Sequence, residues 1–545
     1  MRAGMMKENT LEKTMEDTAR GAGAKSFAYA ASIAAVLLSG CNVGPKYVKP
    51  TAPAPPAFKE SSPEAYGNTP TANNTPATPA TGIWQPAQPQ DAKLKGKWWE
   101  VFNEPELNAL EEQLDINNQN IAVSFQNFMA ARAQVSEAKS QFYPTLTTAP
   151  SYTRQRTPGT LRDAVATTSA SGGTGTVATA GGTTSTNIAL PFDVSWEPDL
   201  WGKIRNTVRE FQYAAQVSAA DLENERLTEQ ADLAETYFEL RGQDSLQDLF
   251  DKTVAADQKS LDLTKALRDT GIDNDEAVAE AEVTLENAQE TAIGIAQNRA
   301  IFEHAIAMLI GKPASGFSMP VKGLTTPVPP IPVGVPSQLL ERRPDIAGAE
   351  RTMAEANAVI GIQKAAFYPT LSLTGSGGLE SSAISSLFSA PAFFWSAGAS
   401  ATETIFDAGL RKATVAQFTA AYNSDVANYR QTVLSAFQQT EDFIATLRVT
   451  SAQIQQEDVA VKSAQRFVDI ATSRYETGLD PYLDVITAQT TLLTDQQTQV
   501  TLRVSEMTAA VELVQALGGG WDATQLPAAE KITSAAAVKQ VSGTP

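Results

Sequence analysis

Cysteine and histidine are almost absent from this 545-residue chain, which has one of each, Cys41 and His304. One cysteine excludes a disulfide within the chain, and the two residues are too few for a Cys/His metal cluster or a histidine-based catalytic triad.

Basic residues are also in deficit, with 42 Lys and Arg against 61 Asp and Glu and a net charge of −19. This balance argues against nucleic acid or anionic lipid headgroups as partners and is explained by solvated helix faces.

Long hydrophobic runs are missing too. The apolar run from Phe27 to Leu38 follows Lys25, is too short to span a bilayer and is typical of a secretion signal. It ends in Leu38-Ser39-Gly40-Cys41, which resembles a bacterial lipobox. We therefore predict a lipoprotein signal peptide over residues 1–40, cleaved at Cys41, which then carries a covalent diacylglycerol and an acyl chain. Asn42 at the next position implies sorting to the outer membrane. The alternative is an ordinary cleavage site beside a chance cysteine.

Proline is confined to a few regions. Eleven of the 30 prolines fall between Val43 and Pro89, so residues 41–95 should form an extended tether that packs little. Eight more lie in residues 313–344, which predicts a segment that crosses the sides of helices. None occurs from Asp199 to Lys312 or from Ala392 to Asp480, where long helices are therefore expected.

Two short motifs each occur twice. Phe142-Tyr143-Pro144-Thr145-Leu146 is repeated as Phe367-Tyr368-Pro369-Thr370-Leu371, and Thr270-Gly271-Ile272-Asp273 returns as Thr477-Gly478-Leu479-Asp480. Proline pushes the residue before it out of the α region, so each first motif should close a helix at its tyrosine and open a strand.

The repeated motifs predict a duplicated protomer. Each half reads helix, strand pair, long helix, glycine turn, helix, which gives repeats over residues 96–312 and 345–520. The first repeat is longer, and we place its extra residues in the Gly/Ser/Thr-rich stretch 169–185. Residues 521–545 are expected to form a flexible tail.

Alternation of apolar and polar residues marks the strands. From Ile188 to Glu197 the even positions are apolar or aromatic and the odd ones mostly polar or small, and a similar pattern runs from Trp395 to Thr402. The length is close to the ~9–11 residues that a tilted strand needs to cross a bilayer. A half-buried soluble sheet would give the same alternation, and the lipoprotein signal favours a membrane barrel. The intervening segments 153–187 and 375–394 are interpreted as surface loops.

Apolar residues recur at helical spacing in the predicted helices. In the second repeat they are Val461, Ala464, Val468, Ala471 and Tyr475, followed after Gly478 by Leu483, Ile486, Thr490 and Leu493. The spacing predicts two antiparallel helices packed as a coiled coil about a glycine turn. From Arg411 to Gly478 the helix would reach roughly 100 Å at 1.5 Å per residue. An earlier helix is expected to run from Leu107 towards Phe142.

A family resemblance rests on several motifs in order. They are Cys41 with Val43-Gly44-Pro45-Lys46-Tyr47, Trp98-Trp99 with Phe102, the stretch from Trp196 to Arg205, Leu339 to Ile346, Ile360-Gly361 leading to Phe367-Tyr368-Pro369, and Arg474-Tyr475 through Gly478 to Gln489. Residues 41–520 thereby resemble the outer-membrane factor (TolC-like) family of efflux proteins, in its lipoprotein branch. Any one motif is weak, whereas the ordered set is specific.

The resemblance implies a mainly α fold with a membrane β-barrel. Family members are homotrimers in which a 12-stranded β-barrel, four strands per chain, is continued by a long periplasmic α-helical coiled-coil barrel. The residues support the trimer independently, because four strands would expose costly unpaired edges in lipid. Two chains would give about eight strands, a barrel filled by its own side chains. Three chains give the first closed barrel with room for a channel.

The resemblance also implies a role and partners. The role is the outer-membrane exit duct of a tripartite efflux pump, a passive channel for drugs, toxic small molecules or metal ions. The partners are a periplasmic adaptor protein, an inner-membrane RND-type pump and outer-membrane lipid, with no nucleic acid. The protein would be lipid-anchored in the outer membrane and extend into the periplasm.

The candidate site residues lie at the glycine turns. In the family, the second-copy turn lines an aperture that is shut at rest, often with acids on the following helix. Asp484 matches one such acid, and the aperture would also include Leu483 and the turn glycines Gly478 and Gly271. Thr487 stands where many members carry a second acid, which puts an acidic double ring in doubt. Glu276 and Glu280 of the first copy are possible substitutes. Alternatively, Asp484 merely caps or solvates a helix start, where negative charge suits the dipole.

Three other functions are weighed against the efflux duct. A type I protein-secretion exit duct would have the same architecture, and the lipobox favours efflux by family analogy only. A non-conducting structural coiled coil of the envelope would lack an open lumen. An enzyme is disfavoured, because His304 lies among Ile301, Phe302, Ile306 and Met308 as an ordinary helix residue, and the carboxylates lack a catalytic or metal-binding setting.

Overall fold

The chain forms two structural units, each built from parts of both repeats. The computed structural model describes residues 42–52, 54–55, 58–60, 96–158, 182–331 and 336–542, so the predicted signal peptide and Cys41 lie outside the described residues. Unit 1 comprises residues 1–47, 134–211 and 355–422, and unit 2 comprises residues 48–133, 212–354 and 423–545. The two repeats are therefore interleaved.

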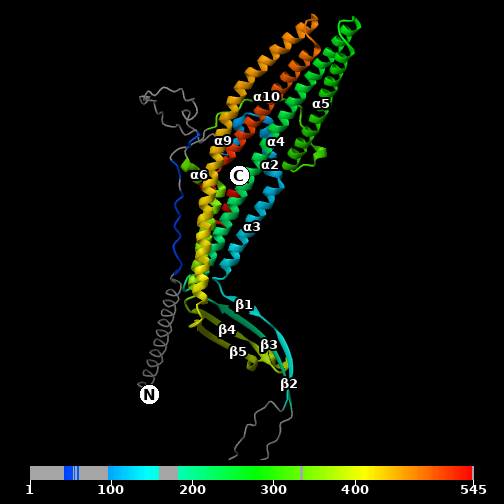
Figure 1. Ribbon diagram of the computed structural model, residues 1–545. Coiled ribbons are helices and arrows are strands. Elements are labelled where there is room, and N and C mark those ends of the chain that lie inside the picture. The colour runs from blue at the N-terminus through cyan, green and yellow to red at the C-terminus, as the bar shows by residue number, and fades with distance from the viewer. Residues whose placement is uncertain are drawn as a thin grey trace, which may run out of the picture. The chain divides into compact units, whose positions relative to one another are not determined.

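The strands of unit 1 form one antiparallel sheet (Figure 1). They are β1 (Thr145–Thr148), β2 (Ser151–Thr157), β3 (Thr183–Trp196), β4 (Thr370–Ser381) and β5 (Phe393–Thr402). Their order is β1-β3-β4-β5, and β2 also pairs with β3. Because β3 and β4 come from different repeats, their pairing joins the two halves of the chain.

β1 and β2 act as one strand. Thr148 of β1 pairs with Phe192, and Ser151 of β2 pairs with Ala189. From one pair to the next, the chain advances by three residues on each side, so the register with β3 is kept across the break. The break falls at Pro150, which has no N–H to donate. With β1 and β2 taken together, the sheet has the predicted strand pair from each repeat, but the strands are longer than predicted. Residues 153–157, 183–187 and 375–381, which were interpreted as surface loops, belong to β2, β3 and β4, so that part of the loop prediction was wrong.

The two faces of the sheet differ sharply in polarity. The cross-strand register places a set of large apolar side chains on one face: Leu146, Tyr152, Ile188, Leu190, Phe192, Val194, Trp196, Leu371, Leu373, Leu379, Phe393 and Trp395. The opposite face carries mainly threonine, serine and glycine, with Asp193 and Glu380. Within the chain, Leu146 remains 67% exposed and Trp395 73% exposed. Exposed apolar surface of this extent marks contact with lipid or another protein.

Helices make up most of the remaining described chain. Their bounds are α2 (Pro105–Asn117), α3 (Gln119–Ser140), α4 (Lys203–Asp269), α5 (Asp275–Leu309), α6 (Pro336–Arg342), α7 (Pro344–Ala365), α8 (Ile384–Leu387), α9 (Leu410–Glu476), α10 (Tyr482–Ala516) and α11 (Ala535–Ser542). Short 3-10 turns occur at Trp98–Phe102, Ala314–Gly316, Ala390–Ala392, Ala523–Gln525 and Ala529–Lys531. The long proline-free helices are confirmed as α4 and α9. Among the described helices, none combines the length and the hydropathy needed to cross a membrane.

The helix expected from Leu107 to Phe142 is interrupted at Asn118. This residue has an extended backbone (φ −63°, ψ 129°), and its side-chain oxygen accepts hydrogen bonds from the amides of Asn120 and Ile121 at 2.8 and 3.0 Å. An asparagine cap of this kind starts a new helix, so the prediction of one continuous helix was wrong. The helices before the two repeated motifs end at Ser140 and Ala365, three residues ahead of the predicted tyrosines.

Parts of the proline-rich tether pack against helix α9. Phe58 is 3% exposed, the amides of Lys59 and Glu60 donate to the Glu441 carboxylate at 2.7 and 2.9 Å, and Arg448 forms a 2.8 Å ion pair with Glu60. For this stretch the expectation of little packing was wrong, because one aromatic anchor and paired charges fix the chain.

The C-terminal segment also differs from the expected flexible tail. Ile532 is fully buried, and Val541 is 2% exposed. Arg132 donates hydrogen bonds to the carbonyls of Ile532 and Thr533 at 2.9 and 3.0 Å. Residues 521–542 are therefore an ordered part of unit 2, held by apolar burial and by one arginine that gathers backbone carbonyls.

Candidate functional site

The two glycine turns connect the long helices in unit 2 (Figure 1). Gly271 lies between α4 and α5 with φ +76°, and Gly478 lies between α9 and α10 with φ +70°. At each turn the next amide closes back onto the helix, from Ile272 to the Leu267 carbonyl at 3.0 Å and from Leu479 to the Arg474 carbonyl at 2.9 Å. This left-handed cap favours glycine, which has no Cβ to clash.

One apolar cluster holds the four helix ends at the turns together. Its buried members are Leu261, Ala277, Val278, Ala281, Leu285, Ala471, Tyr475, Tyr482, Val485 and Ala488. The rings of Tyr475 and Tyr482 have centroids 5.2 Å apart. A Cβ placed on Gly478 would lie 3.9 Å from a methyl group of Ile272, so the two turns are neighbours. We call this region of the chain the helix tips.

The predicted apolar stripe is correct for α9 and only partly correct for α10, where Ile486 packs against the cluster as expected. Ala471 and Tyr475 are buried as expected, whereas Leu483 is 57% exposed and Thr490 is exposed. The fully buried residues at this end of α10 are instead Tyr482, Val485 and Ala488, which belong to the apolar cluster. The prediction failed because the aromatic ring of Tyr482, at the first position of the helix, sets the buried face.

A hydroxyl network links the two helix pairs. The Tyr475 hydroxyl donates to the carboxylate of Asp273 and lies 3.1 Å from Thr264 Oγ1. The Tyr482 hydroxyl lies 3.0 Å from the Ser260 hydroxyl. Burial, and then the hydrogen bond to Asp273, raise the pKa of Tyr475, so its hydroxyl keeps its proton at physiological pH. The network thus fixes α9 and α10 against α4 and its turn.

The predicted aperture residues differ in their exposure to solvent. Leu483, Asp484 and Thr487 are exposed on the first turns of α10, while Glu280 is half-buried on α5. Burial raises the pKa of the Tyr482 hydroxyl, and the charges of Asp257 and then of Glu280 raise it further. The hydroxyl of Thr487 donates to the Leu483 carbonyl at 2.8 Å, so it is satisfied by its own helix.

Charge near the second turn is only partly paired. Arg474 donates to the Asp480 carboxylate at 2.8 Å. No hydrogen bond or ion pair to the side chain of Asp484 is found in the described part of the chain, and the side chain does not cap α10, whose N-cap is Pro481. Asp484 is therefore an exposed carboxylate, close enough to Arg474 to add to the rise in the pKa of that guanidinium after the larger effect of Asp480.

Sequence reasoning missed the Tyr475–Asp273 hydrogen bond. The two residues are 202 positions apart, and no local pattern joins them. One signal was available. The turn motif is duplicated, yet the position of Tyr475 is occupied by Arg268 in the first copy, so the tyrosine is specific to one turn.

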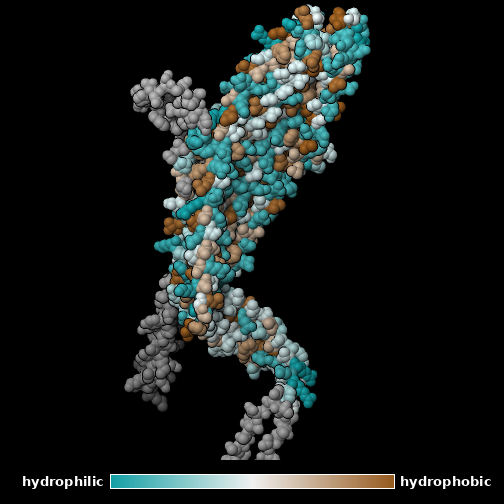
Figure 2. All heavy atoms as spheres, viewed as in Figure 1, coloured by the Kyte–Doolittle hydropathy of each residue, from teal (hydrophilic) through white to brown (hydrophobic). Residues whose placement is uncertain are grey.

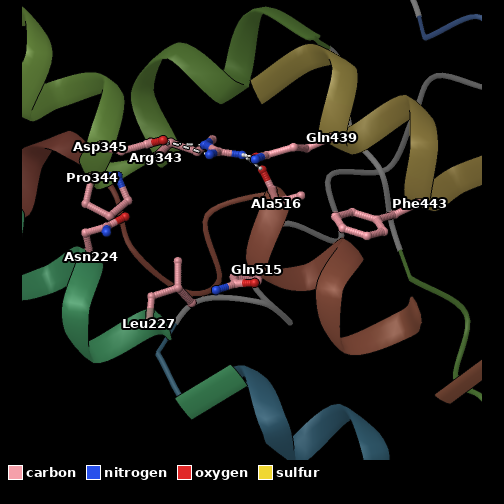
Figure 3. Close-up of a pocket in the computed structure, with 9 residues that line it drawn as sticks. All are labelled: Asn224, Leu227, Arg343, Pro344, Asp345, Gln439, Phe443, Gln515 and Ala516. Carbon is pink, nitrogen blue, oxygen red and sulfur yellow. Dashed lines mark hydrogen bonds and ion pairs between the residues drawn. The ribbon is translucent and has the colours of Figure 1, made fainter. Parts of the chain in front are cut away.

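A cavity of about 170 Å³ lies elsewhere in unit 2 (Figure 3), where Arg343 is the most strongly hydrogen-bonded side chain. Its guanidinium binds both carboxylate oxygens of Asp345 at 3.0 and 2.7 Å and also reaches Gln439 and the Ala516 carbonyl, each at 3.0 Å. With its donors occupied, Arg343 braces the start of α7 rather than offering a ligand site. Across the described residues there is no cluster of His, Cys, Asp and Glu that could hold a metal ion.

The N-terminal segment docks onto unit 1 directly after the predicted lipidation site. The side-chain oxygen of Asn42 accepts from the amide of Gly44 at 3.2 Å and from Asn206 Nδ2 at 3.0 Å, and Asn357 Nδ2 donates to the Pro45 carbonyl at 3.1 Å. Glycine makes the fit possible, because a Cβ on Gly361 would lie 2.7 Å from Asn206 Nδ2. We call this contact the N-terminal socket.

Comparison with known proteins gives the family. A model of the outer membrane efflux protein family matches residues 110–312 and 335–519, which is most of the chain. The chain belongs to the outer membrane efflux protein family. The family resemblance inferred from the sequence motifs is thereby confirmed, while its lipoprotein branch stays a prediction. As a member of this family, the protein serves export across the outer membrane and is not an enzyme.

Individual relatives agree with this family along nearly their whole length. The chain is 28% identical to a toluene efflux pump outer membrane protein, TtgC of Pseudomonas putida, over 90% of this chain and 95% of that protein. It is 27% identical to the pyoverdine export outer membrane protein OpmQ of Pseudomonas aeruginosa, over 84% and 96%. Among solved structures, the outer-membrane channel OprN is similar with a TM-score of 0.75 and 25% identity, over 88% of this chain and 100% of OprN.

Proposed function

We propose that this efflux protein works as a passive trimeric channel, the outer-membrane exit duct of a tripartite pump. The observation that carries the proposal is the pair of open edges of the sheet. Among the described strands, β5 pairs only with β4, and β1 and β2 pair only with β3. Unpaired backbone groups are too costly in lipid, so the edges must pair with other copies of the chain.

The number of copies follows from the strand count. The apolar face, with Phe192, Val194 and Trp395 exposed in one chain, suits contact with lipid, and the polar face suits a wet interior. Two copies would give about eight strands, whose interior side chains fill the barrel. Three copies give a 12-stranded β-barrel with room for a channel, continued by the long helices as a periplasmic α-helical barrel.

A lipid anchor at Cys41 completes the membrane attachment in this proposal. The lipobox supports it, and so does the N-terminal socket, since Asn42 is hydrogen-bonded to Asn206 in the unit that contains the membrane sheet. The acyl chains would thus start from a fixed point of the protein. Mass spectrometry of the mature N-terminus should find acylated Cys41, and an unmodified Cys41 in a chain that begins elsewhere would refute the anchor.

Relatives suggest the cargo and the partners. TtgC is named for toluene efflux and OpmQ for pyoverdine export, so we propose small toxic or amphiphilic molecules as cargo rather than proteins. The partners would be a periplasmic adaptor protein and an inner-membrane RND-type pump. A type I secretion duct is the second candidate. The exported cargo distinguishes the two, because an efflux pump exports small molecules and a type I system exports proteins. A non-conducting envelope coiled coil is disfavoured by the open-edged membrane sheet.

At the helix tips, we propose that the aperture is lined by Leu483, Asp484 and Thr487 near the Gly478 turn, with Gly271 and Glu280 on the first-copy side. The exposure of the three α10 residues in a single chain supports this assignment. The Tyr475–Asp273 hydrogen bond would hold the tips closed.

The test is assembly and conduction by the purified mature protein. Native mass measurement in detergent should give three subunits, and planar bilayers should show discrete channel openings. A stable monomer or dimer would refute the trimer. A trimer that inserts into the bilayer yet never conducts would favour the structural coiled coil instead.

A further inference from the structure

The apolar face of the sheet ends at a row shared by Tyr152 and Ile188. The same alternation continues on β2 and places Arg154 opposite Thr186 and Arg156 opposite Thr184, in the next two rows of that face. On this face of the described strands, the two arginines are the only charged residues.

Charge therefore separates by face. The polar face carries two acids, Asp193 and Glu380, and Glu380 accepts a 2.7 Å hydrogen bond from Asn187 on the same side. The basic pair thus lies on the side of the sheet that is otherwise apolar. Arg154 and Arg156 do not form salt bridges with these acids, because the acids lie on the opposite face of the sheet.

Both arginines are free to bind a ligand. Their side chains are exposed, and within the described part of the chain neither guanidinium forms an ion pair or a hydrogen bond. Strand β4 ends at Ser381, opposite Ile188, so the two arginine rows extend beyond it. Figure 2 shows this end of β2 as hydrophilic.

The position of a residue along the strand determines its depth in the membrane. From Trp196 to Ile188 the apolar rows cover eight residue steps, roughly 27 Å along the strand at ~3.4 Å per residue. A tilted strand projects less than this, so the apolar band matches the apolar belt of about 25 Å in membrane barrels. Tyr152 then lies at the interface, where aromatic residues gather, and Arg154 and Arg156 lie at the level of the lipid headgroups.

The side-chain chemistry fits phosphate. Arginine presents paired N–H donors that match a phosphate bidentately, and its aliphatic stem can lie along apolar surface while the guanidinium reaches the headgroups. The net charge of −19 argued against anionic lipid as a partner of the chain as a whole. Acids more than about 10 Å away are largely screened at physiological salt, so the local pair decides the binding.

We propose that Arg154 and Arg156 form a binding site for the phosphate groups of anionic lipids in the outer leaflet. The site rests on the proposed function, because it requires the apolar face to lie in the membrane. It would fix the vertical position of the sheet at the end opposite to the helices that follow Trp196.

The experiment titrates full-length mature protein in detergent with phosphatidylglycerol and counts bound lipids by native mass spectrometry. The double variant R154Q/R156Q should need a higher half-saturating lipid concentration, by about fivefold for each arginine removed. R154K/R156K should fall between, since lysine keeps the charge and loses the bidentate geometry. High salt should weaken wild-type binding and remove most of the difference between the variants.

The matched control is R430Q/R466Q, which removes the same charge from two exposed positions on α9. It should bind phosphatidylglycerol like the wild type, and all variants should take up zwitterionic phosphatidylcholine equally. Equal half-saturation for R154Q/R156Q and wild type would overturn the site. Displacement of the lipid by inorganic phosphate alone would overturn lipid as the ligand. Failure of the wild type to enter phosphatidylcholine vesicles would instead overturn the proposed membrane function.

Discussion

The hydroxyl of Tyr475 on α9 donates a hydrogen bond to the carboxylate of Asp273, which lies in the turn between α4 and α5. Tyr475 is 4% exposed and Asp273 is half-buried, so the bond is partly buried. It joins the helix pair of the second repeat to the turn of the first. A hydrogen bond from a neutral donor to a charged acceptor contributes about 1.5–3 kcal/mol. This contact is thus strong enough to bias the tips towards one arrangement.

Replacing Tyr475 with phenylalanine should loosen the tips, because Tyr475→Phe keeps the ring in the core and removes only the hydroxyl. The loss of about 1.5–3 kcal/mol would raise the ratio of open to closed tips by roughly 10- to 150-fold. Planar bilayers should show more frequent or longer openings. Tyr429→Phe removes a buried hydroxyl from the same helix and serves as the control. Equal open probabilities in the two variants would assign the Tyr475 bond to stability alone.

Asp484→Ala should reduce cation selectivity. Asp484 is exposed and does not cap α10. If three copies converge to about 6 Å, each pair of carboxylates repels by roughly 0.7 kcal/mol in water, and more in a narrow lumen. Such a ring attracts cations. Reversal potentials across a salt gradient measure the selectivity, and Glu286→Ala on α5 is the control for the loss of one negative charge per chain.

A different result is expected if Asp484 has only a structural role. If the carboxylate only favours the helix start, Asp484→Ala lowers stability by about 0.3–1 kcal/mol and leaves selectivity unchanged in an intact trimer. Thr487 cannot replace the carboxylate, because it is neutral and its hydroxyl is bound to the Leu483 carbonyl.

Features set by local chemistry were predictable from the sequence. The strands followed from alternation, because one face of the sheet is apolar, and both turns followed from Gly271 and Gly478, because they need a left-handed backbone. What escaped prediction depends on distant partners or on where a helix is capped. The break at Asn118, the buried face set by Tyr482 and the Tyr475–Asp273 bond arise from contacts or capping choices that hydrophobic spacing does not encode.

Gly361→Ala should release the N-terminal socket. A Cβ on this residue would lie 2.7 Å from Asn206 Nδ2 and 2.8 Å from its Cγ, so Asn206 must move away from Asn42. Losing one hydrogen bond costs about 1 kcal/mol, which corresponds to roughly fivefold faster amide hydrogen exchange in residues 42–47. Gly294→Ala in α5 meets no atom within 4 Å and should leave that exchange unchanged. Unaltered protection in Gly361→Ala would mean that the socket does not hold the segment.

Glu111 on α2 should make the stability of the protein fall as the pH rises. Its side chain is fully buried, and neither carboxylate oxygen has a hydrogen-bond partner among the described residues. Burial, followed by the charge of Asp115, raises the pKa of Glu111 well above its usual range. The folded state therefore keeps a proton that the unfolded state releases above a pH of about 4.3. Each pH unit between the two pKa values then costs about 1.4 kcal/mol of folding free energy.

Glu111→Gln removes this titration while keeping the size of the side chain. We expect the thermal midpoint of the variant to exceed that of the wild type at pH 7 to 8, and the difference to vanish near pH 4, where both side chains are neutral. Glu235, whose pKa is raised to about 7, and Asp257, whose pKa is raised to about 6, add to the pH dependence of both proteins, so the difference between the two proteins is the quantity to measure. Glu112→Gln changes the exposed neighbour, which is paired with Lys97, and should show no such pH-dependent gain. A Glu111→Gln midpoint that tracks the wild type from pH 4 to 8 would mean that the carboxyl is ionised and solvated in the folded protein.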